Sequence, residues 1–242
     1  MLSALADPLW RKSWMLSVQS FCLRTNFMKI LVTAGPTREP IDPVRFISNR
    51  SSGKMGYSIA SVALRRGHKV VLISGPVSVQ PPPNVILVKV VMAADMLSAV
   101  NEKIEWCDAL VMAAAVSDWR PAELSKEKIK KHKMPDLLPL AQNPDILMTV
   151  APKKGKRIFV GFAAETGRLR PEALRKLREK NLDLIVANDI SRPDAGFEAD
   201  TNRVTLFSAG GEHVELPLMT KEKVAERIIK WIERKQETTL ET

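Results

Sequence analysis

The sequence has no long apolar run and contains few cysteines. No stretch of about 18 apolar residues occurs among the 242 residues, so we expect no membrane-spanning helix and no membrane partner. The two cysteines, Cys22 and Cys107, form no C-x-x-C pair and no other metal-binding spacing, which favours a reducing, cytoplasmic compartment. Hydrophobic residues make up 45% and charged residues 26%, which predicts a globular domain with a sizeable core.

The common nucleotide-binding motifs are also absent. The chain after the first apolar run lacks G-x-G-x-x-G, and the next apolar run ends in Ser74-Gly75-Pro76 without a ribose-binding acid. The segment GKMG at 53–56 is not a P-loop, because neither serine nor threonine follows its lysine. These absences weigh against an oxidoreductase on a dinucleotide fold. A non-catalytic nucleotide-binding module stays open as a second alternative.

Aromatic residues make up only 5% of the chain, whereas positive charge is abundant and local. Residues 126–133 hold five lysines and one acid, and residues 152–180 hold ten Lys or Arg and three Glu, within a formal net charge of +10. Such clusters favour a phosphate-rich partner, and a solvated lysine face is the alternative. Because no aromatic stacking motif accompanies the lysines, we expect small phosphorylated ligands and no nucleic acid.

Short β-branched runs alternate with helical stretches from Lys29 onward. Apolar strands that alternate with helices are typical of a parallel sheet covered on both faces. The sequence therefore predicts an α/β, Rossmann-like three-layer fold with a mostly parallel sheet and a C-terminal hairpin. The expected strands are 29–33, 69–74, 85–91, 108–114, 157–163 and 183–188, the hairpin is 201–218, and the helices are 53–66, 94–105, 171–181 and 221–235.

The two ends of the chain depart from this pattern. Residues 1–27 carry three basic residues and one acid without an apolar core or a cleavage site, so they do not resemble a secretory signal. We interpret them as a disordered extension or a misassigned start. Residues 28–235 are expected to form a single domain, followed by a tail at 236–242.

Ligands of open α/β sheets bind beyond the carboxyl ends of the strands, which selects the segments to inspect. The connection at 34–52 is about 18 residues long, far longer than usual. At its end, Ser51-Ser52-Gly53 can offer backbone N–H groups to an anion, or a serine can simply cap the helix. Asp118 can bind Mg²⁺ through water or a ribose hydroxyl, or cap a buried helix. We expect its neighbour Trp119 to pack in the core.

Three later segments are further candidates. Asn143-Pro144-Asp145 predicts a helix start with Asn143 as the cap, yet this backbone can also read a nucleobase edge. Phe162 lies in the core or flanks a ligand. Lys176 and Lys180 are four residues apart, so they project from one side of a helix, where they fit a triphosphate or form a solvated face.

Several long motifs occur in a specific order. The run AGPTREPIDPVRFISNRSSGKMG, followed by AAAVSDWRP, KEKIKK, NPDIL, GFAAET and KNLDLIVAND, resembles phosphopantothenoylcysteine synthetase of the bacterial type. The resemblance covers roughly 28–231. It implies a homodimeric ligase of coenzyme A biosynthesis that joins 4′-phosphopantothenate to cysteine, driven by CTP through an acyl-cytidylate. Since no decarboxylase sequence precedes it, we expect a stand-alone synthetase with Mg²⁺ and without flavin, and a separate decarboxylase as a candidate partner.

The resemblance also implies roles for individual residues. Lys128 matches the lysine of acyl-cytidylate formation, on a segment polar enough to be a lid. Asn49 and Arg45 match positions at the phosphopantothenate site, next to Ser51, Ser52 and Gly53. The Asn49 amide is expected to donate to the acyl carbonyl while cysteine attacks. The positions that match contacts of CTP are Ala114, Asp118, Lys128, Asn143, Pro144, Asp145, Ile146, Phe162, Lys176 and Lys180, with Asp118 also the candidate ligand of Mg²⁺.

Deletion of residues 1–27 should leave activity and melting temperature unchanged. The segment has no apolar pattern that would pair with the expected sheet, and chain termini are often poorly ordered. Thermal unfolding and turnover of the shortened chain test this expectation. A melting temperature lower by many degrees would show that the extension packs on the core.

Overall fold

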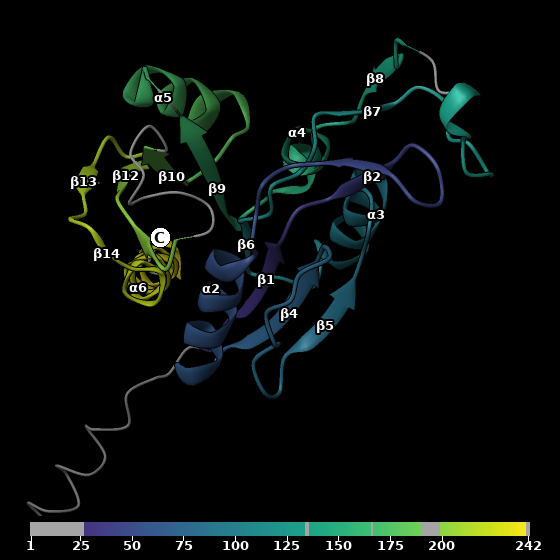
Figure 1. The fold of residues 1–242 in the computed structure, drawn as a ribbon. Coiled ribbons are helices and arrows are strands. Elements are labelled where there is room, and N and C mark those ends of the chain that lie inside the picture. Colours follow the sequence, from purple (N-terminus) through teal and green to yellow (C-terminus); the bar gives the residue numbers. More distant parts are fainter. Residues whose placement is uncertain (1–26, 134–135, 166, 190–198, 241–242) are drawn as a thin grey trace, which may run out of the picture.

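The computed structural model describes residues 27–133, 136–165, 167–189 and 199–240 (Figure 1). The predicted extension at 1–27 therefore falls outside the described residues, except for Phe27. The helices are α2 (Lys54–Arg65), α3 (Ala93–Lys103), α4 (Ile146–Val150), α5 (Leu169–Glu179) and α6 (Lys221–Leu240), with short 3-10 turns η1 (Lys131–Lys133) and η2 (Ala151–Lys153). No helix among the described residues has the length and the apolar content to cross a bilayer.

One sheet of eight strands forms the centre of the fold. Its strands are β1 (Lys29–Ala34), β4 (Lys69–Ser74), β5 (Ile86–Lys89), β6 (Ala109–Met112), β9 (Ile158–Glu165), β10 (Leu184–Asp189), β12 (Val204–Ser208) and β13 (His213–Glu215). Their order is β13-β12-β10-β9-β6-β1-β4-β5. The six strands from β5 to β10 are parallel, and β12 and β13 form an antiparallel hairpin at one edge. The predicted fold class is therefore confirmed.

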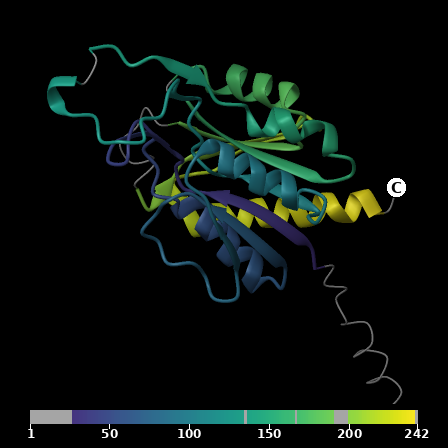
Figure 2. The same ribbon diagram turned by 90° about the vertical axis from the view of Figure 1, so that its right-hand side faces the viewer.

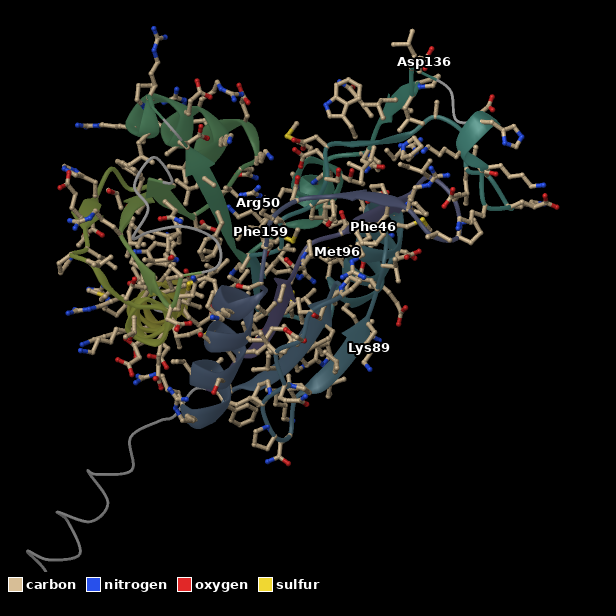
Figure 3. The ribbon with its side chains drawn as sticks, viewed as in Figure 1. Phe46, Arg50, Lys89, Met96, Asp136 and Phe159 are labelled. Atoms are coloured by element: carbon tan, nitrogen blue, oxygen red, sulfur yellow. The ribbon has the colours of Figure 1, made fainter. Side chains whose placement is uncertain are left out.

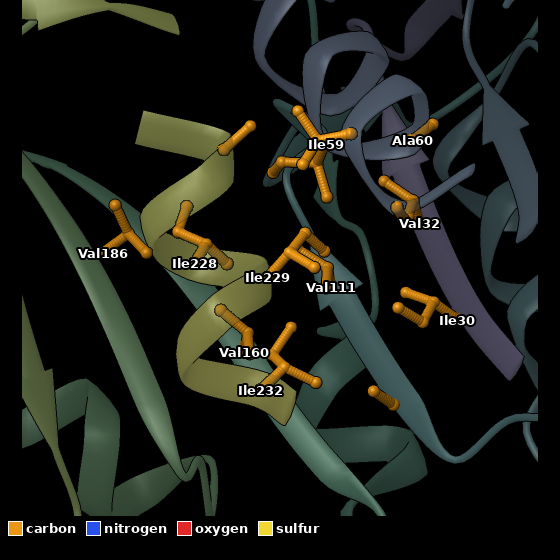
Figure 4. Packing of buried hydrophobic residues seen from close by; sticks show 14 of the residues in the cluster. Ile30, Val32, Ile59, Ala60, Val111, Val160, Val186, Ile228, Ile229 and Ile232 are labelled. Atoms are coloured by element: carbon orange, nitrogen blue, oxygen red, sulfur yellow. The ribbon is translucent and has the colours of Figure 1, made fainter. Parts of the chain in front are cut away.

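Helices cover both faces of the sheet, because apolar side chains alternate between the faces along each strand. On one face α2 and α6 lie side by side and pack against β1, β6, β9 and β10 (Figure 1). Ile228, Ile229 and Ile232 of α6 are fully buried there, against Val111 and Val160 of the sheet (Figure 4). On the other face α3, α4 and α5 pack against a second set of buried side chains from the same strands. Burial of this kind contributes about 1.5–3 kcal/mol for each large aliphatic side chain.

Two short antiparallel pairs lie outside the main sheet. β2 (Arg38–Pro40) pairs with β3 (Phe46–Ser48) inside the long connection between β1 and α2, so that connection contains a hairpin. β7 (Trp119–Pro121) pairs with β8 (Leu140–Gln142) at the base of an extension that we call the arm, residues 119–133 and 136–142. The arm projects from the body of the molecule in both ribbon views (Figures 1 and 2). Asp136 of the arm lies far from Phe159 at the centre of the sheet (Figure 3).

Several predicted boundaries need correction. α6 continues to Leu240, five residues beyond the expected end at Lys235, so residues 236–240 are helical. α5 begins at Leu169, two residues before its expected start. Trp119 was predicted to pack in the core, but it lies on the arm and is 45% exposed.

Candidate active site

A cavity of about 390 Å³ opens at the carboxyl ends of β1, β6, β9 and β10. In an open parallel sheet a crevice forms where the chain leaves neighbouring strands toward opposite faces. Here that point lies between β1 and β6, since β1 continues into α2 on one face while β6 is followed by the arm and α4. The cavity is lined by thirteen of the fifteen candidate residues: Asn49, Ser51, Ser52, Gly53, Ala114, Asp118, Asn143, Pro144, Asp145, Ile146, Phe162, Lys176 and Lys180.

Small residues after β6 form the floor of the cavity. The backbone N–H of Ala114 donates to Thr33 Oγ1 at 3.2 Å, and that of Ala115 donates to the Gly35 carbonyl at 2.9 Å. The Ser117 N–H donates to Thr37 Oγ1 at 3.0 Å. These bonds hold the chain after β6 against the chain after β1, and the short side chains leave room for a ligand along the backbone.

Asn49 joins the two sides of this floor. Its Nδ2 donates to the Val116 carbonyl at 2.9 Å and makes a longer contact of 3.4 Å with the Ala115 carbonyl. These two backbone carbonyls fix the orientation of the Asn49 amide. A ligand that accepts a hydrogen bond from Asn49 has to replace the longer contact, which is the weaker of the two.

Asp145, and not Asn143, caps α4. Asp145 Oδ1 accepts from the Met148 N–H at 3.1 Å, so the prediction of an Asn143 cap was wrong. Asn143 instead donates from Nδ2 to the Ser117 carbonyl at 2.9 Å and from its backbone N–H to the Asp118 carbonyl at 2.8 Å. It therefore fixes the loop before α4 to the loop after β6, and both loops line the cavity.

The two candidate lysines of α5 are paired with acids. Lys176 Nζ lies 2.6 Å from Glu165 Oε1, and Lys180 Nζ lies 2.7 Å from Asp145 Oδ2. Both ammonium groups are partly buried at the cavity. A polyanionic ligand here would compete with these carboxylates for the lysines, and the carboxylates keep the lysines directed at the cavity in its absence.

The start of α2 forms another wall. Gly53 is the N-cap, with φ of 75°, and no side chain caps the helix, so the alternative of a serine cap is wrong. Ser51 Oγ instead accepts from the Gly53 N–H at 3.3 Å. A Cβ added at Gly53 would lie 2.7 Å from Val77 Cγ1, so the close approach and the positive φ both require glycine.

Residues 26–235 match the model of the family described as "DNA/pantothenate metabolism flavoprotein C-terminal domain". The chain belongs to this family. The coenzyme A biosynthesis bifunctional protein CoaBC of Escherichia coli (strain K12) is 47% identical over 206 residues, 84% of this chain and 50% of that protein. CoaBC of Bacillus subtilis (strain 168) is 47% identical over 204 residues, 84% of this chain and 50% of that protein. A crystal structure of the C-terminal domain of CoaBC superposes with a TM-score of 0.75 at 45% identity, covering 87% of this chain and 96% of the other.

The chain spans about half the length of the curated relatives it matches. The matched half is their pantothenate-metabolism C-terminal domain, by the family description and by the solved domain. The resemblance read from the motifs is thus confirmed at the level of family and fold.

The other two of the fifteen candidate site residues, Arg45 and Lys128, do not line the cavity. Arg45 belongs to a separate cluster, in which the turn between β2 and β3 contacts Ile129 of the arm, and Lys128 directly precedes Ile129. The buried Asp42 carboxylate accepts from the backbone N–H groups of Val44 and Arg45, each at 2.8 Å, and from the Ile129 N–H at 3.2 Å. The Arg45 guanidinium pairs with Asp42 and donates to the Ile129 carbonyl at 2.9 Å.

This Asp42 cluster has a clear electrostatic consequence. The hydrogen bond from Arg45 holds the pKa of the Asp42 carboxyl below its usual range, against the effect of burial and with help from the three backbone N–H groups. The carboxylate therefore anchors the lysine-rich segment of the arm next to the β2–β3 hairpin. Lys128 itself is exposed beside this anchor.

Five polar residues that line the cavity are not among the fifteen candidates: Lys54, Ser117, Asn188, Asn202 and Lys221. Asn188 lies at the end of a predicted strand, where the carboxyl-end rule selects it for inspection without assigning it a role. Lys221 starts a predicted helix, but its burial depends on packing that no local pattern shows. Among the described residues, no group of three His, Cys, Asp or Glu is placed to hold a metal ion.

Asp42→Asn should loosen the lysine-rich segment of the arm. The neutral amide accepts more weakly from Arg45 and Ile129, so trypsin should cleave at 126–131 several-fold faster at neutral pH.

The stabilisation that the Asp42 carboxylate contributes depends on pH. Because the pKa of Asp42 is depressed in the folded state, this stabilisation is present above the ordinary carboxyl pKa of about 4 and is lost as pH falls below it. The wild type should therefore lose more stability than the variant on acidification. Asp95→Asn, which removes another carboxylate that accepts backbone N–H groups, is the control, and equal cleavage of both variants would refute the anchor.

Proposed function

We propose that this chain is a phosphopantothenate–cysteine ligase of coenzyme A biosynthesis that uses CTP. The observation that carries the proposal is the cavity at the carboxyl ends of β1 and β6, which gathers thirteen of the fifteen candidate residues, including candidates for both substrates. The names of the relatives, coenzyme A biosynthesis bifunctional proteins, support a place in coenzyme A biosynthesis. The chain acts as a cytoplasmic enzyme and needs no flavin in this proposal.

The first half-reaction joins the pantothenate carboxylate to the α-phosphorus of CTP and releases pyrophosphate. Both reactants are anions, so cations must offset the charge that gathers in the transition state. Lys176 and Lys180 approach the cavity from α5, and they exchange their carboxylate partners for the triphosphate. The backbone of 143–146 reads the cytosine edge, and Phe162 and Ala114 flank the nucleotide.

The second half-reaction transfers the acyl group from CMP to the cysteine amine. The Asn49 Nδ2 donates to the acyl oxygen as the amine adds to the carbon, and CMP then departs. Asn49 is suited to this because the Val116 carbonyl fixes its amide. No side chain needs to act as a strong base, since the amine is a good nucleophile and the leaving phosphate is weakly basic.

Mg²⁺ is the proposed metal cofactor, and Asp118 is its candidate ligand. Mg²⁺ usually takes one or two carboxylates together with substrate phosphates and water. Asp118 fits this pattern, because its carboxylate is exposed at the cavity, and no hydrogen bond from a described residue to that carboxylate is present. When bound, the ion would neutralise phosphate charge.

A homodimer is the proposed assembly. The arm exposes large apolar side chains in the isolated chain, with Leu137 82%, Leu124 58% and Leu140 47% exposed. An apolar projection of this kind is typical of a surface that another chain covers. A second copy would also bring Lys128 of one arm toward the cavity of the other. A separate decarboxylase stays a candidate partner.

Pyrophosphate release tests the function directly. With phosphopantothenate and Mg²⁺, the protein should release pyrophosphate from CTP and form the amide only when cysteine is added. ATP should support much less turnover, because a wrong base leaves buried polar groups unpaired. Equal turnover with both nucleotides would refute the choice of CTP, and no release with either would refute the ligase.

Lys128→Gln should abolish most pyrophosphate release while the fold stays intact. Loss of a charge contact made mainly in the transition state costs about 3 kcal/mol, roughly a hundredfold in rate. Lys126→Gln is the matched control on the same exposed segment. Near-wild-type release by Lys128→Gln would remove the residue from the mechanism.

Co-expression of Lys128→Gln with Asn49→Asp tests whether the arm acts across a dimer. If Lys128 serves the partner's cavity, random mixed dimers restore about a quarter of the sites, because one cavity of each hybrid has both intact residues. If Lys128 serves its own cavity, the mixture stays inactive.

Asn49→Asp should block the second half-reaction more than the first. A carboxylate cannot donate to the acyl oxygen, and it repels that oxygen and the bound phosphates. The nucleotide contacts lie elsewhere in the cavity, so acyl-cytidylate should accumulate even with cysteine present, visible by mass spectrometry. Absence of any intermediate would place Asn49 in binding or activation instead.

A further inference from the structure

Thr37 is a buried polar residue that the proposed mechanism does not use. It lies between β1 and β2, is 0% exposed and does not line the cavity. A buried hydroxyl needs hydrogen-bond partners, and these partners show what the residue holds in place. The hydrogen bonds of Thr37 reach two segments, which are the loop after β6 and the residue before Asn49.

The hydroxyl of Thr37 holds the peptide group that orients Asn49. Thr37 Oγ1 accepts from the Ser117 N–H at 3.0 Å. That N–H and the Val116 carbonyl belong to one planar peptide group, in which they point in opposite directions. The Val116 carbonyl in turn accepts from Asn49 Nδ2 at 2.9 Å. The peptide plane is therefore fixed on one side by Thr37, and it fixes the Asn49 amide on the other.

The backbone of Thr37 holds both ends of the same hydrogen bond. Its N–H donates to the Ala115 carbonyl at 3.3 Å, which secures the residue before Val116. Its carbonyl accepts from Ser48 Oγ at 2.8 Å, and Ser48 directly precedes Asn49. The donor segment and the acceptor segment of the Asn49–Val116 contact are thus both bound to Thr37.

Loss of the Thr37 hydroxyl would release this peptide plane. Ser117 is 4% exposed, so its N–H cannot exchange Thr37 Oγ1 for water without local movement. A buried N–H without an acceptor is costly, and rotation of the peptide group toward another acceptor relieves that cost. Such a rotation carries the Val116 carbonyl away from Asn49. The Asn49 amide would then adopt directions that miss an acyl oxygen in the cavity.

We propose that Thr37 is a positioning residue for the second half-reaction. Through the peptide group of Val116 and Ser117, it sets the direction in which the Asn49 amide donates. This inference rests on the proposed function, under which that amide donates to the acyl oxygen while cysteine attacks. Because Thr37 does not line the cavity, it acts through Asn49 and not through contact with a substrate.

Thr37→Val tests the inference, because it removes the hydroxyl and nearly keeps the side-chain volume. Pyrophosphate release without cysteine measures the first half-reaction, and decay of the isolated acyl-cytidylate on addition of cysteine measures the second. The second should slow about tenfold to a hundredfold and the first less than about threefold, because a misplaced donor stabilises only the later transition state less well. Thr37→Ser, which keeps Oγ1, should restore both rates. Equal slowing of both half-reactions, or none, would overturn the inference.

A double-mutant cycle shows whether Thr37 acts through Asn49. In an Asn49→Ala background, Thr37→Val should slow amide formation no further, because the group that it positions is already absent. If Thr37→Val slows amide formation by the same factor in both backgrounds, Thr37 does not act through Asn49 and the inference fails.

Thr220→Val is the matched control for loss of a threonine hydroxyl. Thr220 Oγ1 also accepts a backbone N–H, that of Lys223 at 3.3 Å, but Thr220 is exposed and outside the cavity. It should leave the ratio of the two half-reactions unchanged. If Thr37→Val does not fold, Ser48→Ala tests the same contact from an exposed residue by removing the hydroxyl that donates to the Thr37 carbonyl. An unchanged ratio in folded Ser48→Ala would then overturn the inference.

Nuclear magnetic resonance keeps the positioning testable if the ligase function fails. In Thr37→Val the side-chain amide signals of Asn49 should shift or broaden, and the Ser117 N–H should exchange with deuterium several-fold faster than in the wild type or in Thr220→Val. If the wild type releases no pyrophosphate, the proposed function is wrong, and these signals still decide whether Thr37 orients the Asn49 amide. Unchanged Asn49 signals and unchanged Ser117 exchange would overturn that orientation.

Discussion

The parallel pairing of β1 with β6 is the constraint on which the site depends. Ile30 to Thr33 pair in register with Ala109 to Met112, so the two strands end side by side. Since the chain leaves them toward opposite faces, the sheet cannot fill the space beyond their ends. The hydrogen bonds from Ala114, Ala115 and Ser117 to the end of β1 and the residues after it then close the floor of this space.

Charge in the cavity is balanced before any ligand arrives. Lys176 and Lys180 are held by Glu165 and Asp145, and Lys54 is held by Asp200. Burying unpaired lysines would be costly, and these acids reduce that cost while keeping the ammonium groups near the cavity. Net affinity for a polyphosphate is therefore a difference between new and broken ion pairs. Lys221 departs from this arrangement, because its ammonium group donates to the Ala199 carbonyl.

Much of the fold could be predicted from local pattern. Apolar runs such as 29–33 and 69–74 are strands because both faces of the sheet are covered, and the carboxyl-end rule then selects Asp118. The ends of the helices were less predictable. Residues 236–240 contain neither glycine nor proline, so nothing in the sequence marks the end of α6. At 143–145 both Asn143 and Asp145 are good caps, and only the contact of Asn143 with Ser117 decides between them. Asn202 and Lys221 are buried by segments distant in sequence, which no single-sequence pattern records.

The Asp42 cluster joins the arm to the β2–β3 hairpin. A single carboxylate receives hydrogen bonds from Val44 and Arg45 on one side and from Ile129 on the other. The hairpin leads directly into Asn49, so these hydrogen bonds connect the lysine-rich segment of the arm with a residue that lines the cavity. A partner that displaced this segment of the arm would therefore also displace the hairpin and, through it, the Asn49 amide.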